Sequence, residues 1–247
     1  MTFQRLLILA ATCLLAACAS TPSPTAPSTP TVLLISMDGV KPDYLGHGDT
    51  PRLDHLARAG VRAQWMNPSY PSLTFPNHYS MVTGLRPDRH GIIHNMMQDA
   101  ELGGFRTSNR EAVGDGRWWG GEPVWVSAER AGLATATLSW PGSEAPVQGV
   151  RPGRWLPFDT SRTLPVRVQT ALDWLSEPDA TRPRLITLYF EQPDSVAHEF
   201  GPSSPQLRAT LREVDAAIGH LLDGIAVRGL QPRVNLVVVS DHGMADV

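Results

Sequence analysis

Three motifs of acidic and histidine residues each follow a separate apolar run of the chain. Asp38 follows the run TVLLISM, and Asp194 and His198 lie four residues apart in EQPDSVAHEFG. Asp241 and His242 are adjacent in SDHGM, after the run NLVVV. Each motif alone also fits a turn or a helix surface, but the shared position after strand-like runs favours one metal site. Carboxylates and imidazoles without cysteine suit zinc, and manganese or iron accepts similar ligands.

These ligands form two groups. Asp38, Asp241 and His242 lie at predicted strand ends, which we expect to be neighbours. Asp194 and His198 are spaced i, i+4, which places both on one face of a helical turn. Two ions roughly 4 Å apart could hold a phosphate between these groups, one activating a nucleophile and the other the leaving oxygen.

Thr74 is the candidate nucleophile, and it precedes Phe-Pro-Asn-His at the start of a helical pattern over 76–84. A Thr at this place also fits a helix N-cap, with Pro76 tolerated in the first turn. A helix N-terminus equally favours a bound phosphate, because its N–H groups and dipole face the anion. A threonine hydroxyl is a weak nucleophile until a metal lowers its pKa, and the chain supplies metal ligands rather than a dedicated base.

The elements that must position these residues alternate along the chain. Short apolar runs predict strands at 31–39, 133–140, 184–190 and 235–240. Helical patterns lie at 51–59, between Thr50-Pro51 and Gly60, and at 76–84, 122–131, 164–176 and 204–228. This alternation predicts an α/β fold with a mostly parallel central sheet flanked by helices on both faces. Ligands of such sheets bind beyond the carboxyl ends of the strands.

The composition is that of one globular domain. The chain has 247 residues, of which 42% are hydrophobic and 18% charged, with a formal net charge of −3. This length allows a substantial core. The mild acidity gives no support for bulk nucleic-acid binding, and no feature predicts a protein partner.

The first 17 residues have the pattern of a lipoprotein signal peptide. One Arg precedes an apolar run that ends in Leu-Ala-Ala-Cys. This ending resembles the bacterial lipobox, in which Cys18 is lipidated and becomes the first mature residue; a plain signal peptide is the alternative. Residues 18–30 are rich in Pro, Ser and Thr and predict a flexible tether.

The same pattern predicts where the protein resides. No Asp follows Cys18, so we expect an outer-membrane lipoprotein on the periplasmic side of a Gram-negative bacterium, with the lipid as its only membrane contact. Cys13 is the only other cysteine and would leave with the signal. The mature catalytic domain, residues 31–247, is therefore predicted to contain no disulfide.

The longer motifs resemble one known family. The segments are TVLLISMDG, PSLTFPNHYSMVTGLRPDRHGIIHN, WWGGEPVW, SWPGSEA, YFEQPDSVAHEFGP and SDHGM. They are similar to the nucleotide pyrophosphatase/phosphodiesterase family of the alkaline phosphatase superfamily, from about residue 31 to the end. The resemblance implies an alkaline-phosphatase-like fold and two-zinc hydrolysis of phosphodiester or pyrophosphate bonds in nucleotides or related diesters, through a phospho-threonine.

The resemblance also implies roles for individual residues. Thr74 matches the nucleophile. The implied ligands are Asp38, Thr74, Asp241 and His242 for one Zn²⁺, and Asp194 and His198 for the other. Asn95, in GIIHN, matches the residue that holds a non-bridging phosphate oxygen. Phe75 and Tyr189 match positions where aromatic rings stack on a nucleobase.

One feature departs from the family pattern. The family's third ligand of the second zinc is a histidine well past the Asp-His-Gly motif, and no histidine of this chain matches it. The remaining histidines are His47, His55, His78, His90, His94 and His220. We therefore expect the front part of a longer enzyme, with one zinc site nearly intact, the other short of one ligand, and an uncovered edge or face of the sheet.

Other activities of the superfamily fit less well. A sulfatase needs Cys or Ser at the nucleophile, where this chain has Thr74. A phosphomonoesterase must bind an additional anionic oxygen, for which Arg is better suited than the neutral Asn95. Arg86 and Arg89 leave that alternative open, but a diester is favoured.

A non-enzymatic alternative also follows from the missing ligand. A truncated, catalytically incomplete lipoprotein could bind metal or ligand without turnover. The intact nucleophile and the intact metal-binding motifs favour the enzyme instead.

Overall fold

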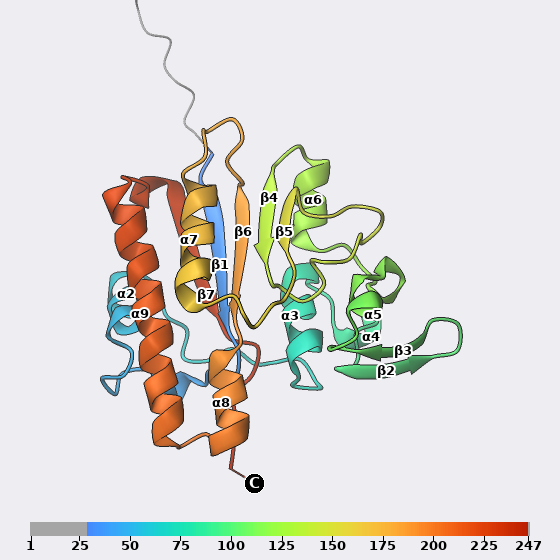
Figure 1. Cartoon of the computed structure of the whole chain (residues 1–247), viewed down its shortest axis with the longest axis horizontal. Coiled ribbons are helices and arrows are strands. Elements are labelled where there is room, and N and C mark those ends of the chain that lie inside the picture. Colours follow the sequence, from blue (N-terminus) through green and yellow to red (C-terminus); the bar gives the residue numbers. More distant parts are fainter. Residues whose placement is uncertain (1–28, 247) are drawn as a thin grey trace, which may run out of the picture.

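A five-stranded parallel sheet forms the centre of the protein in a computed structural model that describes residues 29–246. The strand order is β5-β4-β6-β1-β7, and every pair is parallel. The strands are β1 (Thr31–Met37), β4 (Thr135–Leu138), β5 (Arg154–Leu156), β6 (Leu185–Phe190) and β7 (Val234–Val239). The predicted α/β fold with a parallel sheet is thereby confirmed (Figure 1).

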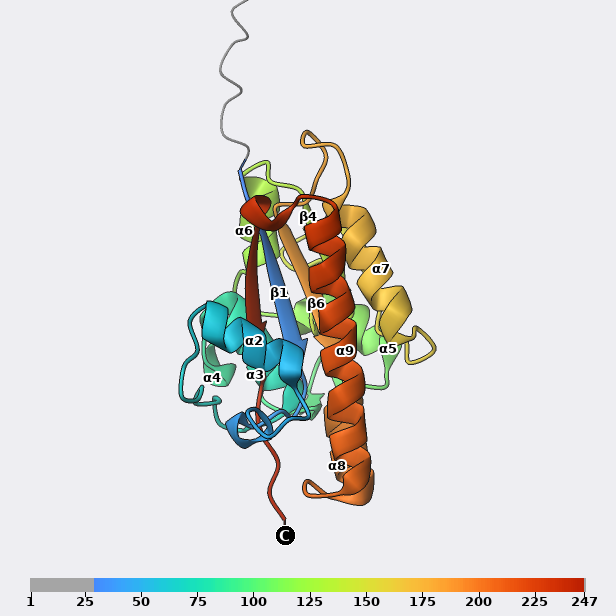
Figure 2. The same cartoon turned by 90° about the vertical axis from the view of Figure 1, so that its left-hand side faces the viewer.

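One face of the sheet is covered by the larger hydrophobic core. Alternate residues of β1, namely Leu33, Ile35 and Met37, are buried there, as the two-residue period of a strand requires. The covering helices are α2 (Pro51–Ala59), α7 (Leu164–Leu175), α8 (Gln192–Phe200) and α9 (Pro205–Val227). Figure 2 shows α2, α7 and α9 in front of this face. Each fully buried aliphatic side chain contributes about 1.5–3 kcal/mol to this packing.

The opposite face packs against an aromatic-rich core. Trp119, Trp125, Trp140 and Tyr79 are buried in it. The elements here are α3 (Thr74–Thr83), α4 (Pro87–His90), α5 (Arg110–Gly114) and α6 (Val124–Arg130). A separate antiparallel hairpin, β2 (Met96–Asp99) and β3 (Gly103–Arg106), extends away from the sheet (Figure 1). Three short 3₁₀ segments complete the described elements: η1 (Pro42–Tyr44), η2 (Gly116–Trp118) and η3 (Gln231–Arg233).

The bounds of the predicted helices and strands agree with those of the structure to within a few residues. Thr50 is the N-cap residue of α2, Pro51 is its first residue, and Gly60 follows its end. The predicted strand at 31–39 is Thr31–Met37. The hairpin and β5 were not predicted, because these segments have only three or four residues each and depend on tertiary contacts for stability.

β7 is an edge strand that pairs with β1 alone within the described chain. Its apolar side chains are incompletely covered: Val237 is 42% exposed, and Val32 on the adjacent strand is 37% exposed. An uncovered edge of the sheet was expected, and this edge agrees with it.

The predicted signal peptide, most of the predicted tether, and Cys13 and Cys18 lie outside the described residues. None of the helices between residues 29 and 246 is long and apolar enough to cross a lipid bilayer.

Candidate active site

The sheet topology brings the three ligand motifs together. β1 lies between β6 and β7, so the segments that follow these three strands share one end of the sheet. Figure 1 shows α3, α8 and the segment after β7 at this end. One oxygen of Asp38, one oxygen of Asp194 and one ring nitrogen of His242 all lie within 4.8 Å of one another. The structure therefore brings one predicted ligand from each of the three motifs together.

Thr74 is the first residue of α3 and not its cap. Leu73 occupies the N-cap position, and no side chain forms a capping hydrogen bond there. The N-cap alternative for Thr74 is thus wrong. Its Oγ1 lies 3.4 Å from His242 Nε2 instead, so the hydroxyl faces the metal-ligating group.

Asn77 determines how the chain enters α3. This buried side chain accepts a hydrogen bond from Ser69 N at 2.6 Å and donates to the carbonyls of Pro71 (3.1 Å) and Leu73 (3.0 Å). These bonds hold the preceding loop against the first turn of the helix. The position of Thr74 therefore depends on Asn77 in the same turn.

His242 Nε2 lies close to three other predicted ligands of the same metal ion. It is 3.1 Å from Asp241 Oδ2 and 3.4 Å from Asp38 Oδ1, in addition to its contact with Thr74. These four residues are the set that the resemblance implied for one metal ion.

The carboxylates have unsatisfied oxygens. Asp38 Oδ1, Asp194 Oδ1 and Asp241 Oδ2 are buried and form no hydrogen bond with the described residues, although the ring nitrogens of His242 and His78 lie 3.1 Å and 3.3 Å from Asp241 Oδ2. Buried carboxylate oxygens without donors are costly unless a cation balances them. Oxygen and imidazole ligands fit zinc. The residues present therefore fit a bound metal ion.

The pKa directions reflect the crowded charges. Burial, and then the charges of Asp241 and Asp194, raise the pKa of Asp38 well above its ordinary value. Burial likewise raises the pKa of Asp194. Burial alone would raise the pKa of Asp241, but His78 and His242 bring it below the ordinary value. A metal cation would favour the charged form of all three carboxylates.

Tyr189 is hydrogen-bonded to the predicted ligand Asp38. Its hydroxyl donates to Asp38 Oδ2 at 2.5 Å, and the side chain is only 6% exposed. The His78 ring lies edge-on with centroids 5.0 Å apart, and Phe158 contacts the ring at 6.1 Å. The expected stacking of Tyr189 on a nucleobase is therefore wrong, because no ring face is open to one. Burial raises the pKa of Tyr189 well above its usual value, so the hydroxyl keeps its proton as a donor.

Asn95 lies next to the nucleophile. Its Oδ1 accepts a hydrogen bond from Phe75 N at 3.0 Å, and its carbonyl accepts from Thr107 N at 3.2 Å. Because Asn95 Oδ1 accepts the hydrogen bond from Phe75 N, the side-chain amide has a fixed orientation, and its two Nδ2 hydrogens point away from Phe75 N. Phe75 is half-buried, with ring centroids 6.0 Å from Phe105 and 5.9 Å from Trp119. Its stacking on a nucleobase stays a prediction.

The second ligand group is more open than the first. Asp194 and His198 both lie on α8, as their spacing predicted, with His198 Nε2 3.5 Å from Asp194 Oδ1. The His198 side chain is 70% exposed. Between residues 29 and 246, no third His, Cys, Asp or Glu joins His198 in a metal-capable group.

Gly39 allows α8 to approach the end of β1. Its φ is +70°, and a Cβ at this position would lie 3.1 Å from Asp194 Cα. Any other residue would therefore strain the turn and displace Asp194 from Asp38.

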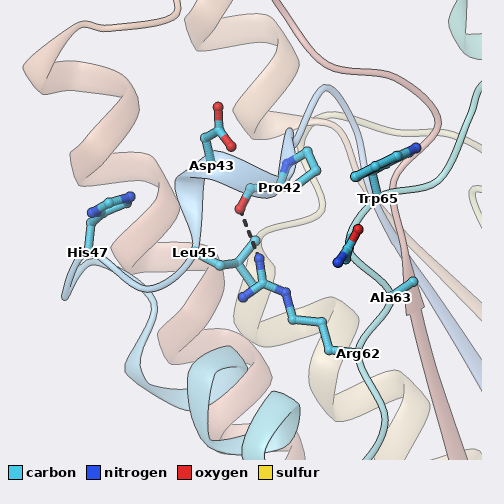
Figure 3. A pocket seen from close by; sticks show the side chains of 8 residues that line it. Pro42, Asp43, Leu45, His47, Arg62, Ala63 and Trp65 are labelled. Carbon is cyan, nitrogen blue, oxygen red and sulfur yellow. Dashed lines mark hydrogen bonds between the residues drawn. The ribbon is translucent and has the colours of Figure 1, made fainter.

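One surface cavity of the described chain is separate from this site. A cavity of about 490 Å³ lies between η1 and the segment around Trp65, where Arg62 donates to Pro42 O at 3.1 Å (Figure 3). None of the ligand-group residues or Thr74 lines it. This cavity is therefore not part of the candidate active site.

The chain is similar in sequence to a known family of phosphodiesterases. The sequence profile of the type I phosphodiesterase / nucleotide pyrophosphatase family matches residues 32–247. An uncharacterized pyrophosphatase/phosphodiesterase of Schizosaccharomyces pombe is 44% identical over 217 residues, covering 87% of this chain and 45% of that protein. Ectonucleotide pyrophosphatase/phosphodiesterase family member 3 of Bos taurus is 41% identical over 218 residues, covering 87% of this chain and 25% of the relative.

Solved structures agree with this similarity. Murine ectonucleotide pyrophosphatase/phosphodiesterase 5, in an inactive threonine-to-alanine variant with AMP bound, superposes with a TM-score of 0.81 at 33% identity. The match covers 87% of this chain and 57% of that one. The chain thus spans about half the length, or less, of the relatives it matches.

Proposed function

The chain belongs to the type I phosphodiesterase / nucleotide pyrophosphatase family, and we propose that it hydrolyses phosphodiester or pyrophosphate bonds of nucleotides or related diesters through a phospho-threonine at Thr74. One observation carries the proposal: Thr74 Oγ1 lies 3.4 Å from His242 Nε2, beside buried carboxylate oxygens without hydrogen-bond partners. A solved relative that binds AMP is inactive as a threonine-to-alanine variant, which supports both the substrate class and the nucleophile.

The chain's own residues divide the chemistry between them. Thr74 Oγ forms a bond to phosphorus while the bond to the leaving oxygen breaks, and the hydroxyl proton passes to solvent or to the leaving group. Water then cleaves the Oγ–P bond and restores the threonine. Asn95 Nδ2 donates to a non-bridging oxygen, and the Thr74 N–H, which has no intrahelical partner at the first position of α3, stabilises the same charge.

Two Zn²⁺ ions would be held by the two ligand groups. Asp38, Asp241, His242 and Thr74 would hold one ion, and Asp194 and His198 would contribute to the other. When bound, such ions lower the pKa of a hydroxyl and stabilise charge at the attacking and leaving oxygens. The unpaired carboxylate oxygens support this ligand set.

A diester is favoured over a monoester. The side chain beside Thr74 is the neutral amide of Asn95, whereas a second anionic oxygen calls for a cation. Arg86 is the exposed N-cap residue of α4, and Arg89 pairs with Asp88 at 3.6 Å with 78% of its side chain exposed. Neither Arg86 nor Arg89 therefore supports the phosphomonoesterase alternative.

The test compares a chromogenic phosphodiester with its monoester, using the purified chain in excess zinc. We expect preference for the diester, loss of turnover in Thr74→Ala, and a phosphate on Thr74 in acid-quenched samples. Zinc binding without turnover or phospho-Thr74 would instead support the binding-only alternative, for which the open second group is the motivating observation.

The location of the protein is a separate proposal. We infer from the sequence that Cys18 carries a lipid that anchors the domain on the periplasmic side of the outer membrane. Metabolic labelling with a fatty-acid analogue tests this: the wild-type chain should be labelled, and Cys18→Ala should be released in soluble form. Equal labelling of both chains would contradict it.

A further inference from the structure

His78 connects three parts of the candidate active site although it is completely buried. Its Nδ1 lies 2.8 Å from the carbonyl oxygen of Thr74 and 3.3 Å from Asp241 Oδ2. Its Nε2 lies 2.8 Å from Ser36 Oγ on β1. One imidazole thus reaches the nucleophile's own main chain, a predicted metal ligand and the central strand.

The hydrogen-bond pattern assigns the position of the ring proton. Thr74 O and the Asp241 carboxylate can only accept, so Nδ1 carries the hydrogen and donates to Thr74 O. Ser36 is completely buried, and His78 is its side-chain partner in the described chain. Its hydroxyl hydrogen would lack an acceptor if it did not donate to Nε2. The Nδ1–H tautomer therefore gives Thr74 O a donor and the Ser36 hydroxyl an acceptor.

The ring is also held on both sides by aromatic neighbours. Trp140 lies edge-on at 5.1 Å between centroids, and Tyr189 does so at 5.0 Å. Trp140 Nε1 additionally donates to the His78 carbonyl at 3.2 Å. Because Tyr189 donates to Asp38, the same packed cluster contacts ligands from two strand ends.

We propose that His78 is a positioning residue, which fixes the distance between Thr74 and Asp241 through its Nδ1–H: the hydrogen is donated to Thr74 O, and Asp241 Oδ2 lies 3.3 Å from the same nitrogen. The inference rests on the proposed function for its effect on turnover, but not for its effect on metal binding. Thr74 begins a helix and Asp241 follows an edge strand, so their relative position depends on contacts such as this one. Loss of a group that orients metal ligands typically lowers metal affinity or activity 10- to 100-fold, by order of magnitude.

Two variants of His78 test whether the hydrogen-bond donor at the Nδ1 position matters, because both remove the imidazole ring but place the amide differently. His78→Asn keeps an N–H donor near the Nδ1 position, whereas His78→Gln places its amide near the Nε2 position. His90 offers a matched control: it is completely buried, its Nε2 lies 2.9 Å from Ser80 Oγ, and the Tyr79 ring lies edge-on at 5.0 Å. His90 does not contact the ligand groups.

We expect His78→Gln to lower zinc affinity, measured by calorimetry, and kcat on the diester by about 10- to 100-fold with KM nearly unchanged. His78→Asn should retain most of both quantities. His90→Asn should change zinc affinity and kcat less than about twofold, even where it lowers the melting temperature. A ¹⁵N ring spectrum of the metal-free wild-type chain should show the Nδ1–H tautomer for His78.

The outcomes distinguish this inference from the proposed function. Zinc affinity reduced by His78→Gln but not by His90→Asn supports positioning, even where the wild-type chain has no turnover and the proposed function fails. Equal zinc affinity in wild type and His78→Gln, or an Nε2–H tautomer, would overturn the inference. If a variant does not fold, the tautomer measured on the wild-type chain still decides it.

Discussion

Arg167 makes the most heavily bonded ion pair of the structure's interior, and its removal has a predictable cost. The guanidinium is completely buried and binds both carboxylate oxygens of Glu191, one of them at 2.8 Å. It also donates to the carbonyls of Tyr189 at 2.9 Å and Arg162 at 2.8 Å. Because Glu191 is the N-cap residue of α8, this pair fixes the start of the helix that carries Asp194.

Arg167→Met leaves Glu191 buried without its cation. Breaking one partner of a buried pair costs about 3–5 kcal/mol. At roughly 2–4 °C per kcal/mol for a domain of this size, the melting temperature should fall by about 6–20 °C. The double variant Arg167→Met with Glu191→Met removes the uncompensated charge. The two carbonyls still lack a donor, so it should retain a deficit of about 1–3 kcal/mol.

The measurement is chemical denaturation followed by circular dichroism, with calorimetric melting in parallel. Arg208→Met is the control, because Arg208 pairs with Asp49 at 2.8 Å but has 60% of its side chain exposed. Such a surface pair contributes about 0–1 kcal/mol. If Arg167→Met costs no more than this control, or the double variant is no more stable than the single one, the reasoning about the buried charge is refuted.

Three further predictions concern the candidate site. With metal removed by a chelator, Asp38→Asn should be more stable than wild type at pH 7. A carboxyl whose pKa is raised by folding destabilises the folded state at pH values above its unfolded pKa, so the stability difference between the two chains should vanish as pH falls below the ordinary value of 3.8. Urea titrations over pH 3–8 measure this difference. Equal stabilities at pH 7 would contradict the prediction. Gly39→Ala should lower the free energy of unfolding by about 1–2 kcal/mol, because φ is +70° and the new Cβ meets Asp194. The same variant should also bind zinc more weakly. An unchanged free energy of unfolding in denaturation and an unchanged zinc affinity in calorimetry would exclude the proposed close approach. Asn77→Ala should cost about 1–3 kcal/mol, because it leaves Ser69 N without its acceptor. Asn77→Asp keeps that acceptor but turns a buried carboxylate oxygen toward the carbonyls of Pro71 and Leu73, so it should cost at least as much; a stability equal to wild type for either variant in urea unfolding would contradict this.

The sequence was sufficient for the class of fold, and it predicted the three residues, Asp38, Asp194 and His242, that the structure brings within 4.8 Å of one another. The continuous apolar run 185–190 is a strand buried along its whole length, and residue type alone predicts such burial. The run 31–37 is also a strand, but Val32 at its start is partly exposed. Thr50-Pro51 and Gly60 mark the ends of α2 because capping and proline geometry are local. Asp38 follows a strand, so its place at the carboxyl end of the sheet also follows from local sequence.

Long-range register was beyond sequence reasoning. Tyr189 is recognisable as a strand residue, but its function depends on pairing with Ser36, two residues before Asp38. That pairing directs its hydroxyl to Asp38 and closes its ring to a nucleobase. In the sequence, Ser36 lies two residues before the predicted ligand Asp38. Only the pairing of β1 with β6 shows that Tyr189 lies beside Ser36 and therefore close to Asp38.

What the sequence by itself determined is therefore chemical: which residues can bind metal, which hydroxyl precedes a helix, and which segments form strands. The tertiary structure decided how these residues meet. It placed β1 between β6 and β7, made Thr74 the first residue of α3 rather than its cap, and placed His78 between Thr74 and Asp241. The physical reason is that residue type and local capping act within a few positions along the chain, whereas strand order and side-chain hydrogen bonds join segments more than 150 residues apart.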